Sequence, residues 1–354
     1  MNAQKTILIM AGGTGGHIFP ALAVAERLRD DGWRVVWLGN PDGMEARLVP
    51  QHGYEIRWLH FGALRGKGLL RKLLLPLNLL RGMWQARQVI KHLQPNVVLG
   101  LGGYITFPGG LMAAWMNCPL VIHEQNSVAG LANRVLASLA ADRVLTGFPE
   151  VLAKGEWVGN PVRPEITRVP EPEKRLEARD DALRLLVIGG SLGAQALNSV
   201  VPKGLALIDL GSRPQVVHQA GEKHLDELKA NYAEASVHAH CVAFIEDMAG
   251  AYAWADIVIC RAGALTVAEL AVAGVPAIFV PFPHAVDDHQ TGNAKFLVNV
   301  GGAFLLPQDQ LTPESVALIK NYSRGQLKQM AELARSMARP DATETVARIC
   351  TEIA

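Results

Sequence analysis

The residues of this 354-residue sequence that are most suited to chemistry lie in short glycine-rich turns. Each turn follows an apolar, strand-like run and opens a helix-like pattern, so its backbone N–H groups and the helix dipole would attract a phosphate. Alternatively, the glycines only permit tight strand-to-helix turns. The turns are GGTGGH at 12–17, GLGGYITFPGG at 100–110, GGSLGA at 189–194 and RAGALTVAE at 261–269. Phosphate binding is therefore a candidate function for each of them.

Two common nucleotide-binding motifs are absent from the sequence. The dinucleotide fingerprint requires G-x-G-x-x-G, whereas the sequence reads G-T-G-G-H-I from Gly13 and G-S-L-G-A-Q from Gly190. None of the glycine turns ends in Gly-Lys-Ser/Thr, so the Walker loop is also missing. NAD-dependent oxidoreduction and P-loop chemistry thereby lose their sequence support.

The turn at 261–269 carries the more specific chemistry. Gly263 would let the backbone approach a diphosphate, and Thr266 would add a hydroxyl in the first helical turn. Glu269 follows one turn later, where a carboxylate can accept hydrogen bonds from both hydroxyls of a ribose. The alternative for Glu269 is an acid of the first helical turn that is favoured by the helix dipole.

Three residues are candidates for proton transfer. His17 ends the first glycine turn, and an imidazole suits proton transfer near neutral pH, so it is our candidate general base. The alternative is a histidine at a helix start that only orders the loop. His123 and Glu124 end a predicted strand and could orient the base or share its role.

The surrounding pattern predicts a duplicated α/β fold. Short β-branched runs alternate with helical patterns, as in parallel βαβ units. The segment 5–17 resembles 183–195, and 96–124 resembles 256–281, in the same order. Because the chain also exceeds the usual size of one core, we expect two Rossmann-like domains. Four prolines and mixed charge at 159–174 mark the junction.

Composition limits the class of protein. Apolar residues make up 49% and charged residues 19%, which is typical of a globular protein. Neither a signal peptide nor a run of about 18 apolar residues is present, so we expect a soluble or peripheral protein. The cysteines show no C-x-x-C pair and read as buried thiols of a reducing compartment. They are Cys118, Cys241, Cys260 and Cys350.

A basic, leucine-rich segment suggests contact with a membrane. No acidic residue occurs between Glu55 and Glu124, while eight basic residues do. A helix predicted at 77–93 would bury one stripe, formed by Leu79, Met83, Ala86, Ile90 and Leu93. A second stripe with basic neighbours would form an interfacial patch for anionic lipid, unless its leucines also belong to the core. This patch consists of Leu77, Leu80, Trp84, Arg71 and Lys72. Few aromatics accompany the basic residues, which argues against nucleic acid.

Taken together, these motifs resemble the MurG family of bacterial undecaprenyl-diphospho-muramoylpentapeptide β-N-acetylglucosaminyltransferases, of glycosyltransferase family 28. The resemblance covers essentially the whole chain and follows the family order. Its most specific segments are 10–25, 43–56, 64–68, 97–113, 123–134, 158–163, 189–194, 244–270 and 276–294. One departure is Leu192, where the family usually has Gln, so a polar contact from that side chain is lost.

The resemblance implies a GT-B fold, with two Rossmann-like domains whose parallel sheets face across a cleft. The first domain would span 1–162 and bind the acceptor and the membrane, with a last helix at 341–354 packing back on it. The second would span 163–340 and bind UDP-GlcNAc. Uracil would lie near Ile245, ribose on Glu269, and the sugar hydroxyls on Gln290. The full set of implied donor contacts is Thr14, Gly15, Gly16, Asn126, Arg163, Ser191, Ile245, Ala264, Leu265, Thr266, Val267, Ala268, Glu269 and Gln290.

The acceptor implied by the resemblance is lipid I, the undecaprenyl-diphosphate-linked MurNAc-pentapeptide. Its diphosphate would lie near Gly13, Gly102, Gly103 and Tyr104. The C4 hydroxyl of MurNAc would attack GlcNAc with inversion and give lipid II for peptidoglycan synthesis, and hence for cell shape and division. The enzyme would be peripheral on the cytoplasmic face of the inner membrane. Other cell-wall synthesis and division proteins are further candidate partners.

We expect this chemistry to need no metal cofactor. The sequence has no D-x-D, and Asp287, Asp288 and His289 make only a speculative metal site. A helix terminus and backbone amides can stabilise the leaving diphosphate instead. Three other functions remain open: a UDP-GlcNAc 2-epimerase, a different lipid glycosyltransferase, and a nucleotide-sugar-binding regulator without turnover.

Overall fold

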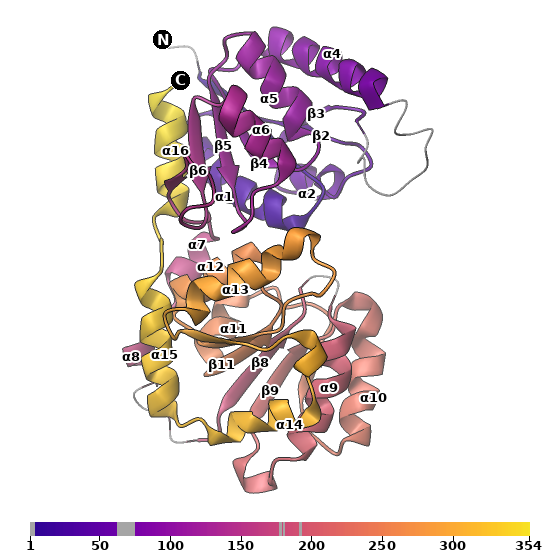
Figure 1. Cartoon of the computed structure of the whole chain (residues 1–354), viewed down its shortest axis with the longest axis vertical. Coiled ribbons are helices and arrows are strands. Elements are labelled where there is room, and N and C mark those ends of the chain that lie inside the picture. The colour runs from indigo at the N-terminus through magenta and orange to yellow at the C-terminus, as the bar shows by residue number, and fades with distance from the viewer. Residues whose placement is uncertain (1–3, 62–74, 177–178, 180, 191–192) are drawn as a thin grey trace. The chain divides into compact units, whose positions relative to one another are not determined.

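The computed structural model describes residues 4–61, 75–176, 179, 181–190 and 193–354. The chain divides into two compact units (Figure 1). The first consists of Met1–Arg163 and Pro340–Ala354, and the second of Pro164–Arg339. The division after Arg163 lies one residue beyond the expected boundary and falls inside the proline-rich junction.

Among the described residues, the first unit holds one parallel sheet with the strand order β3-β2-β1-β4-β5-β6-β7. Its strands are β1 Thr6–Ala11, β2 Arg34–Gly39, β3 Glu55–Trp58, β4 Val97–Gly102, β5 Leu120–Glu124, β6 Arg143–Thr146 and β7 Glu156–Trp157. Its helices are α1 Gly15–Asp30, α2 Glu45–Gln51, α4 Leu75–Leu93, α5 Thr106–Trp115, α6 Leu131–Leu139 and α16 Ala342–Glu352.

The second unit holds a parallel sheet with the strand order β10-β9-β8-β11-β12-β13 in its described residues. Its strands are β8 Arg184–Ile188, β9 Gln215–Gln219, β10 His240–Val242, β11 Ile257–Cys260, β12 Ala277–Phe279 and β13 Ala303–Leu305. Its α-helices are α7 Pro164–Thr167, α8 Pro172–Leu176, α9 Gln195–Ala206, α10 Leu225–Glu234, α11 Met248–Trp254, α12 Ala264–Ala273, α13 His289–Val298, α14 Pro313–Ala317 and α15 Arg324–Ser336. Short 3₁₀ helices lie at Leu210–Ser212, Glu222–His224, Val286–Asp288, Gln308–Gln310 and Leu318–Asn321.

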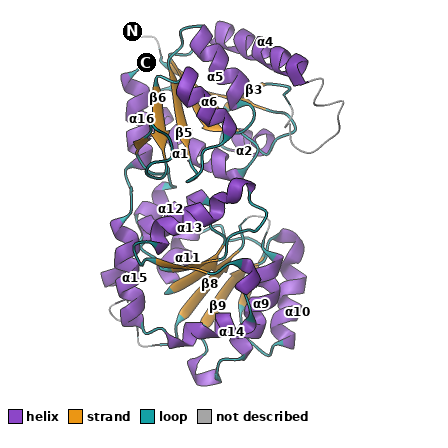
Figure 2. Ribbon diagram, in the orientation of Figure 1, coloured by secondary structure: helices purple, strands orange, loops and turns teal. Residues whose placement is uncertain are grey.

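Apart from the additional edge strand β7 in the first, the two sheets repeat one strand order, which confirms the duplicated pattern in the sequence. Figure 2 shows the strands of each unit among the helices of that unit. β1 and β4 are neighbours in the first sheet, as β8 and β11 are in the second. At each of these pairs the strand order changes direction. Ligands of open α/β sheets bind beyond the carboxyl ends of the strands at such a point. The glycine turns after β1, β4, β8 and β11 all begin there.

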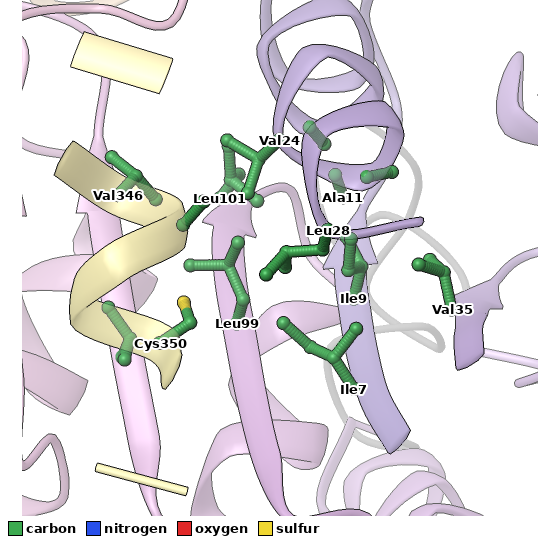
Figure 3. Close-up of a cluster of buried hydrophobic side chains, with 14 of the residues drawn as sticks. Ile7, Ile9, Ala11, Val24, Leu28, Val35, Leu99, Leu101, Val346 and Cys350 are labelled. Atoms are coloured by element: carbon green, nitrogen blue, oxygen red, sulfur yellow. The ribbon is translucent and has the colours of Figure 1, made fainter. Parts of the chain in front are cut away.

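Alternate residues of β1 serve the two faces of the first sheet, because successive side chains of a strand point to opposite sides. Ile7 and Ile9 pack with residues of α1 and α16, whereas Leu8 and Met10 pack with residues of α4, α5 and α6. Val346 and Cys350 of α16 join the first of these clusters, beside Leu99 of β4 (Figure 3). The last helix of the chain is therefore part of the first core.

α4 begins at Leu75, two residues before the predicted helix, and has the predicted buried stripe. Ala86 and Ile90 are buried, and Leu79, Met83 and Leu93 are partly buried against the same core. The side chains of Leu77, Leu80 and Trp84 are 64%, 61% and 62% exposed. Arg71 and Lys72 lie outside the described residues.

The four cysteines are all free thiols. Three are buried as predicted, but Cys241 is only half-buried, because the short strand β10 lies at the edge of its sheet. In the described part of the chain, no helix has the length and apolar character needed to cross a bilayer.

Candidate active site

The first unit brings two glycine turns into contact at the carboxyl ends of β1 and β4. Gly103 has a φ of +85°, and a Cβ atom there would lie 2.5 Å from the carbonyl oxygen of Gly12. A Cβ atom on Gly102 would lie 2.8 Å from the ring of His17. Only glycine permits both approaches. The turns at 12–17 and 102–104 therefore form one surface, and Tyr104 lies beside Gly13.

A buried carboxylate that the sequence analysis missed holds the first turn. Glu45, at the start of α2, is fully buried, and its oxygens accept hydrogen bonds from the N–H groups of Gly13 and Asn40, each at 3.0 Å. Burial raises the pKa of Tyr104, and the charge of Glu45 adds to this rise. The N–H group of Gly13, one of the expected contacts of the acceptor diphosphate, is thus already bonded inside the protein.

His17 and His123 are connected through Gln125. His17 Nδ1 lies 2.7 Å from Gln125 Oε1, and His123 Nδ1 lies 3.0 Å from Gln125 Nε2. His17 is half-buried on α1, whereas His123 is fully buried at the end of β5. Burial lowers the pKa of His123 to about 4, so its ring is neutral near pH 7. Of the two imidazoles, His17 is the one that solvent and ligands can reach.

The carboxylate of Glu124 accepts hydrogen bonds from the loop that follows it. One carboxylate oxygen accepts from the backbone and side-chain amide groups of Asn126, at 3.0 and 3.3 Å. The other accepts from the Gly130 N–H group and from Asn133 Nδ2, at 3.0 and 2.9 Å. These four donors hold both oxygens of the carboxylate against the loop that follows β5. The structure therefore favours a positioning role for Glu124, and Asn126 is the residue that it positions.

The second unit presents the amino end of α12 at its own switch point. The helix begins after Gly263, whose φ of −64° is accessible to any residue, so the backbone conformation there does not require glycine. Ala264, Leu265 and Thr266 form the first turn, and in the described residues no side chain caps their N–H groups. Val267 is fully buried, so its side chain cannot reach a ligand, whereas Ala268 is half-buried. The uncapped turn can hold an anion.

Glu269 lies in the second turn of α12, and no acid occupies the first turn. Its reading as a first-turn acid is therefore wrong. Its side chain is buried, and Oε2 accepts a hydrogen bond from the hydroxyl of Tyr252 on α11, at 3.0 Å. Tyr252 was not predicted, because a tyrosine in an apolar helix reads as core.

The glycine turn after β8 is tied to the Ile245 loop by Gln219. Gln219 Nε2 donates to the carbonyl oxygen of Gly190 at 2.9 Å, and its Oε1 accepts from the N–H group of Ile245 at 3.0 Å. Gly193 has a φ of +76°, and a Cβ atom there would lie 1.8 Å from the Ala220 carbonyl oxygen. Ser191 and Leu192 lie outside the described residues. The loops expected to bind the diphosphate and the uracil of UDP-GlcNAc are thus both hydrogen-bonded to the buried side chain of Gln219.

Gln290 begins α13 together with His289. Its Oε1 accepts a hydrogen bond from the N–H group of Phe282 at 2.9 Å, which fixes the carboxamide beside the β12–α13 loop. Asp288 accepts from the Thr291 hydroxyl at 2.7 Å. Across the described residues, no group of three or more His, Cys, Asp or Glu side chains is placed to hold a metal ion.

The expected donor contacts are divided between the two units. Those in the first unit are Thr14, Gly15 and Gly16 on the first glycine turn, Asn126 after β5, and Arg163 at the junction. Those in the second unit are Ile245, the residues of α12 from Ala264 to Glu269, and Gln290. The first glycine turn and the first turn of α12 each lie at the switch point of their own sheet.

Comparisons with known proteins agree with this architecture. The models of the glycosyltransferase family 28 N-terminal and C-terminal domains match residues 7–146 and 184–352. A relative from Dechloromonas aromatica is named UDP-N-acetylglucosamine–N-acetylmuramyl-(pentapeptide) pyrophosphoryl-undecaprenol N-acetylglucosamine transferase. It is 73% identical over 351 residues, 99% of each chain. A relative of the same name from Cupriavidus necator is 60% identical over 355 residues, covering 100% of this chain and 99% of its own.

Solved structures agree as well. The crystal structure of Acinetobacter baumannii MurG matches with a TM-score of 0.87 and 41% identity, covering 98% of this chain and 99% of that one. A UDP-GlcNAc 2-epimerase from Neisseria meningitidis matches with a TM-score of 0.66 at 14% identity, which shows a shared fold alone. The expected two-domain α/β fold of the GT-B class is confirmed. The chain belongs to glycosyltransferase family 28, within the group named for N-acetylglucosamine transfer to pyrophosphoryl-undecaprenol-linked N-acetylmuramyl-pentapeptide.

Proposed function

We propose that this chain transfers N-acetylglucosamine from UDP-GlcNAc to lipid I, forming lipid II for peptidoglycan synthesis. The observation that carries the proposal is the 73% identity, over 99% of both chains, with a relative whose name states this reaction. The epimerase alternative has only a fold likeness at 14% identity. The residue roles below are those that the family resemblance implies, combined with the contacts found within each unit.

The second unit binds the donor. The uncapped first turn of α12 faces the diphosphate, and its dipole stabilises the charge that develops on UDP as it leaves. Glu269 accepts the ribose hydroxyls, with its carboxylate oriented by Tyr252. The loop at Ile245 lies along the base, and Gln290 contacts the sugar hydroxyls.

The first unit binds the acceptor and removes its proton. His17 Nε2 takes the proton of the MurNAc C4 hydroxyl while that oxygen forms a bond to the anomeric carbon. The bond from that carbon to the UDP oxygen breaks, and the electron pair leaves with UDP. Attack opposite the leaving group inverts α to β. The turns at Gly13 and at Gly102–Tyr104 bind the acceptor near its diphosphate.

The reaction proceeds without a metal cofactor. The α12 terminus supplies positive charge where other glycosyltransferases use a divalent ion. Complete loss of activity in EDTA, restored by magnesium or manganese, would contradict this part of the proposal.

The enzyme works as a peripheral protein on the cytoplasmic face of the inner membrane. Leu77, Leu80 and Trp84 give α4 an exposed apolar face in a segment without acidic residues. Such a face can lie in the lipid interface, where basic neighbours add attraction to anionic lipid. The enzyme then binds its lipid-linked acceptor at the membrane surface.

The test is UDP release with lipid I supplied or withheld. Transfer predicts UDP and lipid II only when both substrates are present. Conversion of UDP-GlcNAc without acceptor would indicate an epimerase, and binding without turnover would indicate a regulator. His17→Ala should lower kcat on the order of 10²- to 10⁴-fold while sparing UDP-GlcNAc binding. Near-normal turnover of this variant would remove the base assignment.

A further inference from the structure

Three buried or half-buried groups of the first unit form a continuous hydrogen-bonded chain. It runs from the carbonyl oxygen of Gly159 to His123 Nε2 at 2.8 Å, and from His123 Nδ1 to Gln125 Nε2 at 3.0 Å. Its last link joins Gln125 Oε1 to His17 Nδ1, at 2.7 Å. Each link needs one donor and one acceptor, so the proton positions follow from the fixed end of the chain.

The fixed end is the carbonyl oxygen of Gly159, which can only accept. His123 must therefore carry its proton on Nε2. Burial lowers the pKa of His123 to about 4, so the ring holds only this one proton near neutral pH. His123 Nδ1 is then an acceptor, and Gln125 Nε2 is its donor.

A second hydrogen bond fixes the orientation of the Gln125 amide. Gln125 Nε2 also donates to the carbonyl oxygen of His123, at 2.9 Å, which an amide oxygen in that place could not do. Asn160 Nδ2 donates to the carbonyl oxygen of Gln125, at 3.0 Å, and holds its backbone. The Gln125 side chain is almost fully buried, and its Oε1 therefore faces His17.

An amide oxygen carries no hydrogen, so the proton between Gln125 and His17 lies on His17 Nδ1. We propose that Gln125 is a positioning residue that fixes the tautomer of His17, so that Nε2 of that ring presents its lone pair as the proton acceptor. Gln125 does for His17 what an orienting carboxylate does for a catalytic histidine, but without a charge. The proposal rests on the proposed transfer reaction, which gives Nε2 a proton to accept.

The charged and titratable groups around His17 come from three neighbouring elements. His123 and Glu124 end β5, directly before Gln125. Tyr104 lies beside Gly13 after β4, and Glu45 of α2 accepts from the Gly13 N–H group. The carboxylate of Glu124 is bonded to the loop that follows it. These groups are the same in every variant compared below, so a difference between variants reports on position 125.

The direct test is ¹⁵N NMR of the histidine rings in the unmodified full-length enzyme, with His17 assigned from His17→Gln. We expect a pyrrole-type shift for His17 Nδ1 and a pyridine-type shift for Nε2, and the reverse for His123. A protonated Nε2 on His17 near neutral pH would overturn the proposal. This result does not depend on activity.

Substitution separates positioning from packing. Gln125→Met should populate the other His17 tautomer and lower kcat on the order of 10- to 100-fold, with the UDP-GlcNAc KM within about twofold. Gln125→Glu supplies an acceptor toward His17 again, but its second oxygen must be protonated to donate to His123 Nδ1 and to the His123 carbonyl oxygen as Gln125 Nε2 does. With this neutral carboxyl group, the tautomer and much of kcat should return. The matched control is Gln51→Met, at an exposed glutamine of α2 in the same unit.

A normal kcat for Gln125→Met, or a change in KM alone, would overturn the proposal. Failure of the proposed function looks different, because the unmodified enzyme would then release no UDP with lipid I, whatever the tautomer of His17.

Discussion

The hydroxyl of Tyr252 donates a hydrogen bond to Glu269 Oε2 at 3.0 Å, between α11 and α12, and both side chains are buried. A buried carboxylate keeps one orientation only if its oxygens have partners. Tyr252 therefore sets the direction of the carboxylate that we assign to the ribose. The same contact ties α11 to the helix whose amino end we assign to the diphosphate.

Removing this hydroxyl should weaken donor binding more than chemistry. We expect Tyr252→Phe to raise the UDP-GlcNAc KM roughly fivefold, equivalent to about 1 kcal/mol, with kcat nearly unchanged. Glu269→Ala should raise KM further. Steady-state kinetics and calorimetric titration with UDP measure both effects. An unchanged KM for Glu269→Ala would refute ribose binding.

A matched control exists in the same unit. Tyr232 is also buried, and its hydroxyl lies 2.9 Å from His218 Nδ1. Neither residue is an expected contact of UDP-GlcNAc. Tyr232→Phe should lower the free energy of unfolding but spare UDP affinity. UDP that lacks both ribose hydroxyls should bind equally to Tyr252→Phe and to the unmodified enzyme. A difference there would mean that Tyr252 acts through packing.

Gln219 couples two loops of the donor unit, so its loss should affect the base and diphosphate contacts together. We expect Gln219→Leu to weaken UDP binding roughly tenfold, because the Ile245 N–H group and the Gly190 carbonyl both lose their partner. Gln219→Glu keeps the acceptor for Ile245 and should lose less. Calorimetry with UDP and with uridine measures the two contacts separately.

The control for this prediction lies on the same strand. Gln215 is the exposed first residue of β9, whereas Gln219, which hydrogen-bonds to Gly190 and Ile245, is the last. Gln215→Leu should bind UDP normally. If Gln219→Leu also binds UDP normally, the two loops hold their positions without Gln219.

Stability should fall as the pH drops below about 6.5, because two histidines are buried in the neutral form. Burial lowers the pKa of His123 to about 4 and that of His218 to about 3, from a usual value of 6.5. Between these values the unfolded chain binds more protons than the folded one, so acid favours unfolding. The contribution is complete above pH 6.5 and is lost as the pH falls toward the folded values.

Urea unfolding at pH 7, 6 and 5 measures this effect. Each histidine can contribute a slope of up to ~1.4 kcal/mol per pH unit. His218→Gln should flatten the dependence, whereas His238→Gln, at an exposed histidine of the same unit, should leave it as it was. Equal slopes for all three proteins would show that His218 does not titrate in this range.

Local patterns were sufficient to predict the switch-point loops. A strand, a glycine turn and a helix are adjacent in sequence, so the turns after β1, β4, β8 and β11 could be recognised without tertiary contacts. The two stripes of α4 could be predicted for the same reason, since residues three and four apart share a helix face. His17, His123 and Glu269 were found because they follow such turns or strand ends.

The residues that orient these groups could not be predicted from local patterns. Gln125 meets His17 across 108 positions, and Gln219 meets Ile245 across 26. Glu45 holds Gly13 from 32 positions away. A buried Gln, Glu or Tyr has no periodic signature, and its partner is fixed only when strands far apart in sequence become neighbours. The docking of α16 on the first core likewise depends on a tertiary contact that its own amphipathic pattern does not specify.

The exposed face of α4 leads to a test of membrane binding. Leu77, Leu80 and Trp84 are each more than half exposed although they are apolar, while the opposite stripe of the same helix is in the core. Replacing all three with serine removes apolar surface that a lipid interface could bury, at ~25 cal/mol per Å². The core stripe is untouched, so the fold should persist. We expect weaker binding to vesicles that contain anionic lipid, and normal affinity for UDP.

The control uses exposed leucines of the second unit. Leu207, Leu210 and Leu318 are 51%, 82% and 55% exposed, and no membrane role is assigned to them. Replacing these three with serine should leave vesicle binding intact. Raising the salt concentration should weaken binding of the unmodified enzyme to anionic vesicles, because the basic segment contributes through charge, which salt screens. If the α4 triple variant sediments with vesicles as well as the unmodified enzyme does, the lipid-binding face lies elsewhere and the exposed leucines of α4 need another explanation.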